Sequence, residues 1–405
     1  MNQEHQTDKP ERGSTPRVMV AMSGGVDSSV AAGLMVEAGY DVIGLTMKLR
    51  DATPEERGGQ KGSCCSPDDL MDARVACDVL GIPHYVVDYR AVFKAEVIDP
   101  FAESYLQGRT PNPCVNCNDK VKFAPLLERA KALNADYLVT GHYAIIRENK
   151  RGERALFRGK DRGKDQSYFL FGMSQEALDM TLFPLGEMVK DEVRDHARRL
   201  GLPNWDKADS EDICFVPQGS YADVVEKIAG PDRVPQPGPI MNLAGERVGA
   251  HQGLHHYTIG QRRGVGVSTG ERVYVVGIEP ETRTLIVGPP EALKVQGLRA
   301  ERCRFRNNQD GIGVHEVNAQ IRYRHRGVSA QVITKGSAAE VMFDEPLSAV
   351  TPGQAVVFYR GDEVMGGGWI EEALSSPERD IEGATQRSEV SQLMQGVGLI
   401  AAEER

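Results

Sequence analysis

The sequence predicts an α/β protein, with a Rossmann-like parallel sheet carrying helices on both faces, then a small β-rich central domain and a C-terminal β-barrel. Short β-branched apolar runs alternate with helical patterns in the first half. A stretch with four prolines, 231–239, separates that half from a second half rich in glycine and alternating strands. The predicted boundaries are a disordered N-terminus at 1–15, domains at 16–219, 220–292 and 293–374, and a polar tail at 375–405.

Composition narrows the class of protein. A chain of 405 residues exceeds what one core usually covers, which agrees with several domains. No window approaches the roughly 20 apolar residues of a membrane helix, and the polar start lacks the apolar segment of a signal peptide. We therefore expect a cytoplasmic protein with no membrane partner. Its seven cysteines, an odd number, indicate reduced thiols rather than a disulfide framework.

The first strand and the loop after it predict an anion site. Val18–Ala21 reads as a buried strand, Ser23–Ser28 as a glycine loop, and the residues from Ser29 as a helix. Glycines 24 and 25 let backbone N–H groups approach a phosphate, and the helix adds its positive N-terminus. The loop lacks a Walker lysine. It is similar to the pyrophosphate loop of the ATP pyrophosphatase superfamily, whose members adenylate a carbonyl oxygen.

Further βα units come after this loop. Asp41–Met47 and Tyr85–Asp88 are predicted strands, with a helix over Asp68–Leu80 between them. Ligands of such sheets bind at the carboxyl ends of the strands. Met47 lies at such an end, where it packs either on an adenine ring or into the core. Cys64, Cys65 and Cys77 show no pattern that indicates a role.

Two later stretches carry reactive side chains. Gly108–Phe123 contains prolines and asparagines that predict a non-helical loop up to a helix from about Lys120. Its Cys114-x-x-Cys117 turn is typical of a redox pair, half a metal site, or a nucleophile with a neighbour. A buried strand over Tyr137–Ala144 carries a Gly-His pair, Gly141 and His142, on the expected ligand side of the sheet.

Two basic clusters stand out in a protein of net charge −10, one over 147–164 and one over Arg322–Arg326. Each is either a solvated surface or a contact for nucleic acid, and their joint presence favours RNA. Tyr221–Gly230 is a predicted helix, and Val314–Arg324 and Val328–Thr334 are predicted barrel strands. His255 and His256 show no metal-ligand partner at convincing spacing, so RNA contact or a structural role is favoured over zinc. A short helix is expected near 390–401.

The chain resembles the bacterial tRNA-specific 2-thiouridylase family, whose members replace O2 of the wobble uridine of tRNA with sulfur. The resemblance runs from about Arg17 to about Arg360. Its ordered blocks are Met22–Ser29, Arg109–Pro113, Cys117–Asn118, Val121–Phe123, Thr140–Ala144, Lys164–Leu170, Ser210–Phe215, Tyr257–Gly264, Ile321–Arg324 and Thr351–Tyr359.

The resemblance implies an ATP pyrophosphatase catalytic domain, a tRNA-contacting central domain and an activity that uses ATP and Mg²⁺. Asp27 is the expected partner of the ion. The residues implied in ATP binding are Ala21, Met22, Ser23, Gly24, Gly25, Val26, Asp27, Ser28, Met47 and Gly141. Those implied in tRNA binding are Asn112, Pro113, Cys114, His142, Lys164, Asp165, Gln166, Arg322, Tyr323 and Gln354. Expected partners are the tRNAs for Lys, Glu and Gln, and a cysteine desulfurase or sulfur-relay protein.

By the same resemblance, Cys214 carries a persulfide, and Cys117 is the nucleophile that forms a transient disulfide with it. Both thiols should then be at least partly exposed. One departure opens an alternative, because Cys114 stands where many relatives have aspartate. Cys114, Cys117 and Cys214 together make a ligand set for a [4Fe-4S] cluster that delivers sulfide. A metabolite-adenylating enzyme and a non-enzymatic RNA-binding protein are the alternatives to a sulfurtransferase.

Overall fold

The computed structural model describes residues 15–51, 67–209, 213–216, 220–267, 270–306 and 312–375. The chain forms two compact units. The first comprises Met1–Phe93, Asp119–Gln166 and Met173–Phe215, and the second comprises Lys94–Asn118, Ser167–Gly172 and Val216–Arg405. The predictions for the N-terminal segment, the tail with its helix, Cys64, Cys65 and Ser210–Asp212 lie outside the described residues.

A five-stranded parallel sheet in the order β3-β2-β1-β4-β7 forms the centre of the first unit. Its strands are β1 (Arg17–Ala21), β2 (Asp41–Lys48), β3 (His84–Asp88), β4 (Tyr137–Val139) and β7 (Thr181–Leu182). The helices of this unit are α1 (Val26–Glu37), α3 (Pro67–Leu80), α4 (Arg90–Phe93), α7 (Ala124–Ala132), α8 (Gln175–Asp179) and α9 (Lys190–Arg199). The predicted α/β fold is confirmed.

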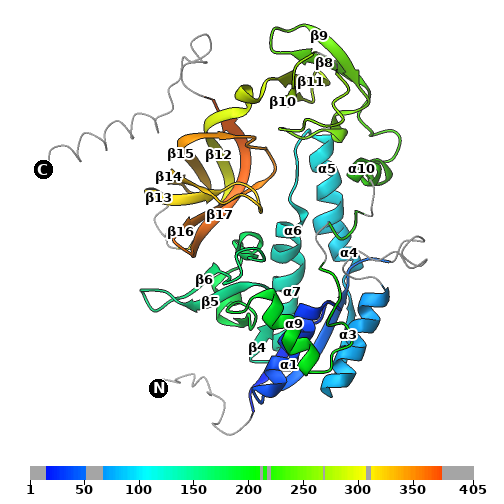
Figure 1. Cartoon of the computed structure of the whole chain (residues 1–405), viewed down its shortest axis with the longest axis vertical. Helices are drawn as coiled ribbons and strands as arrows, with labels where there is room; N and C mark the ends of the chain where they lie inside the picture. The colour runs from blue at the N-terminus through cyan, green and yellow to red at the C-terminus, as the bar shows by residue number, and fades with distance from the viewer. Residues whose placement is uncertain are drawn as a thin grey trace, which may run out of the picture. The chain divides into compact units, whose positions relative to one another are not determined.

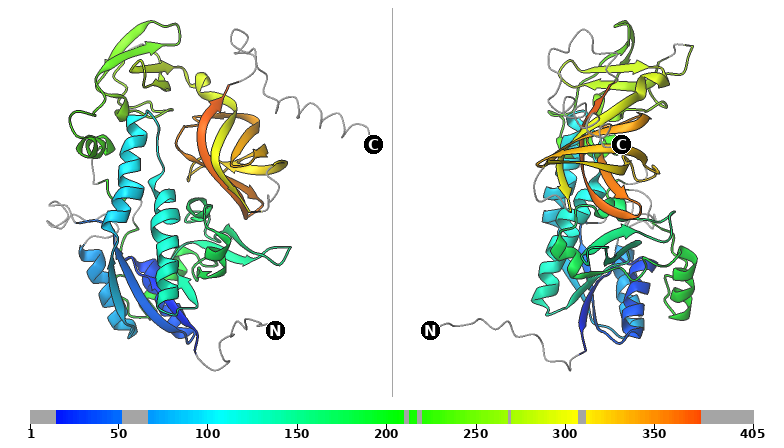
Figure 2. Two further views of the ribbon diagram at one scale, coloured as in Figure 1. Left: turned by 180° about the vertical axis from the view of Figure 1, so that it is seen from behind. Right: turned by 90° about the vertical axis from the view of Figure 1, so that its left-hand side faces the viewer.

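Helices cover both faces of this sheet. Val18 and Val20 of β1 share one apolar core with residues of α1, α3 and α9. Successive side chains of a strand point to opposite faces, so Met19, fully buried, points to the other face, where α7 packs on β1 and β4. Figures 1 and 2 show these helices around the sheet. A hairpin of β5 (Ala144–Glu148) and β6 (Arg154–Arg158) comes after β4.

The second unit contains the helices α5 (Asp99–Leu106), α6 (Pro113–Asn116) and α10 (Tyr221–Ala229) and a four-stranded sheet in the order β10-β11-β8-β9. The strands are β8 (Gly238–Asn242), β9 (Arg247–His251), β10 (Tyr274–Glu279) and β11 (Thr284–Gly288). β8 and β11 pair in parallel, and their side chains Ile240, Leu285 and Val287 form the core with Val275 of β10. This is the predicted β-rich central region.

A closed antiparallel barrel completes the second unit. Its strands are β12 (Lys294–Phe305), β13 (Ile312–Gln320), β14 (Val328–Lys335), β15 (Ala338–Ser348), β16 (Ala355–Arg360) and β17 (Glu363–Leu374). They run in the order β12-β15-β14-β13-β16-β17, and β17 pairs back onto β12 (Figure 1). Closure leaves no free edge. Fully buried Leu298, Val332, Val341 and Phe358 fill the interior. The predicted β-barrel is confirmed.

Two predictions of local structure are wrong. The stretch after Asn112 is helical rather than a loop, with α6 continuing into the π-helix η2 (Cys117–Phe123). Pro113 occupies the first helical turn, where its fixed φ suits a helix, and the Asn112 side chain accepts a bond from the Val115 N–H at 3.4 Å. The predicted strand over Tyr137–Ala144 is interrupted, because β4 ends at Val139 and β5 begins at Ala144.

Among the helices that the structure describes, none combines the length and apolar character needed to cross a membrane.

Candidate active site

The order of the parallel sheet places a ligand site at the ends of β1 and β4. The chain runs outward from β1 to β2 and β3 and then returns to β4 on the other side of β1. Ligands of doubly wound sheets bind at the carboxyl ends of strands where the order reverses. The loops there begin after Ala21 and after Val139. A Cβ atom on Gly141 would lie 2.7 Å from the backbone nitrogen of Ser28, so the loop after β4 touches the first turn of α1 and requires glycine at this position.

The loop after β1 is held in one conformation by bonds to Gly24. This glycine has φ +77°, and a Cβ atom on it would overlap the carbonyl oxygen of Asp69. Its own carbonyl accepts hydrogen bonds from Asn204 Nδ2 at 3.1 Å and Lys207 Nζ at 3.2 Å. Because the N–H and C=O of a trans peptide point in opposite directions, these bonds direct the N–H of Gly25 away from Asn204 and Lys207.

Hydrogen bonds within the loop after β1 also fix its conformation. The Ser28 hydroxyl accepts a bond from the Ser23 N–H and donates one to the Gly25 carbonyl, each at 3.1 Å. Gly25 is the N-cap of α1 and makes no side-chain cap bond. The first N–H groups of a helix have no partner within the helix, so this end of α1 presents donors and a positive dipole to an anion.

A chain of alternating charges lies beside this loop. Lys190 Nζ is 2.7 Å from both Asp27 Oδ1 and Asp209 Oδ1, and Lys164 Nζ is 2.7 Å from Asp209 Oδ2. The Tyr143 hydroxyl also donates to Asp27 Oδ1, at 2.8 Å. Burial opposes ionisation of Asp209, but hydrogen bonds from Lys164 and Lys190 outweigh it and lower the pKa of that carboxyl. The side chain of Lys190 is only 10% exposed, which makes this cation a built part of the site.

Lys190, Asn204 and Lys207 were not predicted from the sequence. Lys190 is separated from Asp27 by 163 positions, and Lys207 from Gly24 by 183. No motif joins them to the loop, and only the fold brings them there. The remaining residue predicted for ATP, Met47, lies near the carboxyl end of β2 and is 8% exposed. That position is the one expected of it, and its side chain is largely buried.

His142 sits in the loop after β4 as an uncharged ring. Its Nδ1 is 2.7 Å from the Thr140 hydroxyl oxygen, and its ring lies 5.8 Å from that of Phe123 and 5.7 Å from that of Phe183. Burial, with a smaller contribution from Lys122, lowers the pKa of His142 to about 3. The imidazole is therefore neutral at physiological pH and acts as a hydrogen-bonding group, not a cation.

This pKa predicts a pH dependence of folding. Below pH 6.5 an unfolded histidine takes up a proton, whereas folded His142 does so only near pH 3. The stabilising effect of neutral His142 is therefore complete above pH 6.5 and is lost as the pH falls toward 3, by at most about 5 kcal/mol. Urea unfolding of the wild type and His142→Asn at several pH values should show a smaller loss for the variant in this window. Parallel pH profiles from 6.5 to 3 would contradict the assignment.

Asp165 and Gln166 hold the local chain. Asp165 is 7% exposed and accepts hydrogen bonds from the Gly159 N–H at 2.9 Å and Arg158 Nη1 at 3.2 Å. The Gln166 side-chain oxygen accepts from the Tyr143 N–H at 2.9 Å, and the Gln166 N–H donates to the Tyr143 carbonyl at 2.8 Å. These bonds fix the backbone that presents His142.

Several side chains of the basic cluster over 147–164 are bound to other parts of the protein. Arg154 donates to the carbonyls of Leu178 and Thr181, and Arg147 lies 4.4 Å over the ring of Phe157. Together with Arg158 and Lys164, these side chains have partners within the first unit. The cluster is therefore in large part structural, and its charge alone does not define a nucleic-acid surface.

In the second unit, the segment before Cys114 is fixed by the barrel. Gln354 Nε2 donates to the carbonyls of Thr110 and Pro111, each at 3.1 Å, and the Thr110 N–H donates to the Pro352 carbonyl at 3.0 Å. Asn112 and Pro113 are buried, whereas Cys114 is exposed. Of these three residues, all implied in tRNA binding by the resemblance, only Cys114 is exposed.

The expectation that Cys117 is at least partly exposed is wrong, because its side chain lies buried, with 8% of the residue exposed. The helical course from Pro113 is the reason, since it turns Val115, Cys117 and Asn118 inward. Cys214 belongs to the first unit and is half-buried, as expected. Burial raises the pKa of Cys77 and of Cys303 to about 12, so neither thiol is reactive.

The second basic cluster differs from the first. Arg322, Arg324 and Arg326 are exposed, and Tyr323 between them is half-buried, with its ring 4.5 Å from that of Phe169. The Gln320 side chain donates to the carbonyls of Arg322 and Tyr323, which fixes the turn after β13. This turn projects alternate arginines outward from the barrel around an aromatic ring.

The ligand site at the ends of β1 and β4, where the strand order reverses, and the glycine loop after β1 define a nucleotide-binding α/β enzyme of the pyrophosphate-loop class. Residues 16–218 match the family described as "tRNA methyl transferase HUP domain". Residues 227–289 match "tRNA methyl transferase PRC-barrel domain", and residues 295–370 match "Aminomethyltransferase beta-barrel domain".

The relatives specify the family further. The chain is 47% identical to the tRNA-specific 2-thiouridylase MnmA of Methylorubrum populi, over 90% of this chain and 95% of that protein. It is 48% identical to that of Geobacter metallireducens, over 89% and 98% of the two chains. The chain belongs to the tRNA-specific 2-thiouridylase family. A 4-thiouridine synthetase solved with RNA and ATP shares 16% identity at a TM-score of 0.30, covering 54% of this chain and 51% of that one.

Proposed function

We propose that the protein is an ATP-dependent tRNA-uridine 2-sulfurtransferase. It adenylates O2 of uridine 34 and replaces that oxygen with sulfur, giving 2-thiouridine, AMP and pyrophosphate. The observation that carries the proposal is the glycine loop at the β1/β4 switch point, in a chain 47% identical to a named 2-thiouridylase. Adenylation is needed because a uridine carbonyl oxygen is a poor leaving group, whereas AMP is a good one.

ATP binds at the cradle formed by Ala21–Ser28 and Gly141, with Met47 near the adenine. The buried ammonium of Lys190, 2.7 Å from Asp27, supplies the positive charge that a Walker lysine provides elsewhere. The carboxylates of Asp27 and Asp209 fit Mg²⁺, which prefers oxygen ligands. The ion would neutralise phosphate charge there, and Asp27 would exchange its bond with Lys190 for one to the metal. His142, neutral and flanking the loop, offers hydrogen bonds without adding charge to the site.

Sulfur transfer uses Cys214 and Cys117. The terminal sulfur of a Cys214 persulfide attacks C2, and the C–O bond to AMP breaks. The Cys117 thiolate then attacks the Sγ atom of Cys214, the old S–S bond breaks with its electrons passing to the sulfur on C2, and a Cys117–Cys214 disulfide forms. An external dithiol reduces that disulfide, and a cysteine desulfurase or sulfur-relay protein restores the persulfide. Because Cys117 is 8% exposed, its helical segment must open before the second attack.

A second route for the sulfur is suggested by Cys114, an exposed thiol three positions before Cys117 on the helical segment. Thiolates are the ligands of iron–sulfur clusters, so Cys114, Cys117 and Cys214 fit a [4Fe-4S] group by their chemistry. Such a group supplies a site for sulfide when bound. Iron and acid-labile sulfide analysis after anaerobic purification separates the two routes. The persulfide route requires neither iron nor sulfide at stoichiometric amounts. About four of each per chain would support the cluster route in its place.

The RNA substrate is recognised in a single-stranded loop. A wobble uridine is already unpaired, so it is extruded into a site for only a few kcal/mol. The exposed arginines around Tyr323 match a phosphate backbone with a stacking base. Substrates are tRNAs with a wobble uridine, those for Lys, Glu and Gln.

Arg322→Ala should weaken tRNA binding similarly across tRNA sequences and lower the slope of log affinity against log salt by roughly 0.7 to 0.9, because one phosphate contact is lost. Filter binding or fluorescence anisotropy at several salt concentrations measures this. Arg299→Ala is the matched control, since Arg299 is also an exposed arginine of the barrel but pairs with Glu372. An unchanged slope for Arg322→Ala, or an equal change for Arg299→Ala, would make Arg322 an ordinary solvated side chain.

Turnover tests the whole proposal. With ATP, a persulfide donor and unmodified tRNA, the protein should release AMP in a tRNA-dependent reaction and produce 2-thiouridine detectable by nucleoside mass spectrometry. AMP release that ignores tRNA would indicate a metabolite-adenylating enzyme. Binding of tRNA without any AMP would indicate an RNA-binding module.

A further inference from the structure

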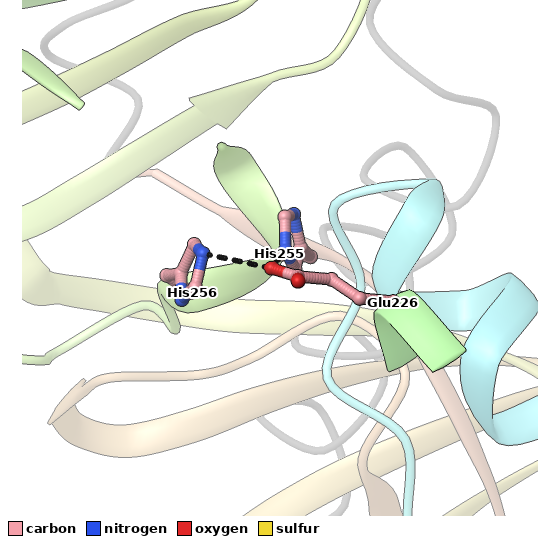
Figure 3. A group of neighbouring side chains, drawn as sticks. All are labelled: Glu226, His255 and His256. Carbon is pink, nitrogen blue, oxygen red and sulfur yellow. Dashed lines mark hydrogen bonds and ion pairs between the residues drawn. The ribbon is translucent and has the colours of Figure 1, made fainter. Parts of the chain in front are cut away.

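Two adjacent histidines of the central domain meet a glutamate from a distant helix. His255 and His256 lie in the 3₁₀ turn η4 (Leu254–His256), and Glu226 lies on α10. His255 Nε2 is 3.0 Å and His256 Nε2 is 3.5 Å from the same atom, Glu226 Oε1 (Figure 3). The sequence shows no partner for a metal at convincing spacing from these histidines, because Glu226 lies 29 positions before His255 in the chain.

The three atoms have the spacing of metal ligands. One ligand atom from each residue lies within 4.8 Å of the other two, the one such His/Cys/Asp/Glu group found in the part of the chain that the structure describes. At metal–ligand distances of about 2.0–2.1 Å, two ligands of a tetrahedral zinc ion are roughly 3.3 Å apart. The observed 3.0 and 3.5 Å lie on either side of this value. Two imidazoles and one carboxylate are a donor set that zinc prefers.

The contacts of the nearby residues show which of them are available as metal ligands. His255 is almost fully buried, and its ring is packed against the backbone of Gly253, where a Cβ atom would lie 2.5 Å from His255 Cε1. His251 is committed elsewhere, because its Nε2 lies 2.9 Å from the Arg283 carbonyl oxygen and its Nδ1 accepts from the Gly253 N–H at 3.1 Å. Asp223, one turn before Glu226 on α10, acts on His256 only as a nearby charge.

The two nitrogens of His255 differ in their surroundings, and the other two residues of the cluster are open to solvent. The buried Nδ1 of His255 has no hydrogen-bond partner in the protein. A histidine that ligates zinc through Nε2 carries its proton on Nδ1, so Nε2, which faces Glu226, is the nitrogen available to a metal. The side chains of His256 and Glu226 are 32% and 42% exposed, so an ion can reach the site from solvent.

We propose that Glu226, His255 and His256 form a binding site for a divalent transition metal of the zinc type, with a water as the fourth ligand. Bound metal would join α10 to the turn η4 and so stabilise the central domain of the second unit. Loss of this site would leave the nucleotide loop intact, because none of the three residues belongs to the first unit.

Metal-stripped full-length protein titrated with Co²⁺ tests the site directly. The expected result is one four-coordinate Co²⁺ per chain, with visible d–d absorption and no thiolate-to-cobalt charge-transfer band, displaced by Zn²⁺. The missing band distinguishes this site from the cysteines. Glu226→Gln and His256→Ala, both at partly exposed positions, should each weaken binding by more than about tenfold, because even outer-shell changes cost about that much. Asp223→Asn is the matched control and should bind as the wild type does.

Zinc should also raise the Tm of the wild type and of Asp223→Asn but not of Glu226→Gln or His256→Ala. Circular dichroism of the metal-free variants checks that they are folded. A Co²⁺ spectrum dominated by thiolate charge transfer, or metal affinity unchanged in both ligand variants, would overturn the proposal and leave a His–Glu hydrogen bond that only ties η4 to α10.

Discussion

Cys117→Ser and Cys214→Ser should each lower the rate of 2-thiouridine formation by at least about 10³-fold, the scale expected for loss of a nucleophile. Both should leave tRNA-dependent pyrophosphate release from ATP nearly unchanged, because the carbonyl oxygen is activated before sulfur arrives. The two measurements are nucleoside mass spectrometry and a pyrophosphate assay on the same samples. The prediction rests on the proposed roles of the two thiols in sulfur delivery.

The control is a cysteine that burial has made inert. Cys303 lies in the barrel core with its pKa raised to about 12, so Cys303→Ala should retain both activities. A Cys214→Ser enzyme that still thiolates tRNA from a cysteine desulfurase would show that the persulfide resides elsewhere. Loss of pyrophosphate release in Cys117→Ser would show that this thiol acts in activation instead.

The parts of the molecule that the sequence predicts best are local. Ser23–Ser28 is predictable because the strand, the loop and the helix that make an anion site are contiguous in the sequence. Lys190 and Lys207 illustrate the limit: each reaches the loop only after the chain has passed through β4 and β7. Glu226 and His255 show the same limit in the central domain, where neither residue predicts the other.

The preferences of residues at the start of a helix explain why the prediction of a loop around Cys117 is wrong. Proline and asparagine are turn formers on average, but at the start of a helix Pro113 fits the first turn and Asn112 caps it. The same residue types therefore predict a loop or a helix start, and the next residues of the chain decide between the two. Here the apolar residues Val115 and Val121 bury themselves in the helical arrangement, and Cys117 is buried with them. The exposure of a reactive thiol is thus a property of the conformational state, which a sequence motif does not encode.

The shape of the nucleotide loop leads to the second large effect, on ATP binding. Gly24→Ala should raise the Kd for ATP by about 10²-fold, the scale of a loop displaced by an ångström. A methyl group there would overlap the Asp69 carbonyl oxygen, and the loop cannot yield without losing its bonds to Asn204 and Lys207. The residue also has φ +77°, which costs a non-glycine residue roughly 1–2 kcal/mol in any environment.

Gly39→Ala separates the two causes. Gly39 lies just after α1 in the same unit with φ +81°, so it bears nearly the same backbone strain, but a Cβ atom there would meet nothing within 4 Å. Gly39→Ala should lose free energy of unfolding from strain alone, Gly24→Ala should lose at least as much, and only Gly24→Ala should lose ATP affinity, as measured by urea unfolding alongside calorimetric titration. Equal ATP affinities in the two variants would mean that the loop after β1 tolerates the added methyl group.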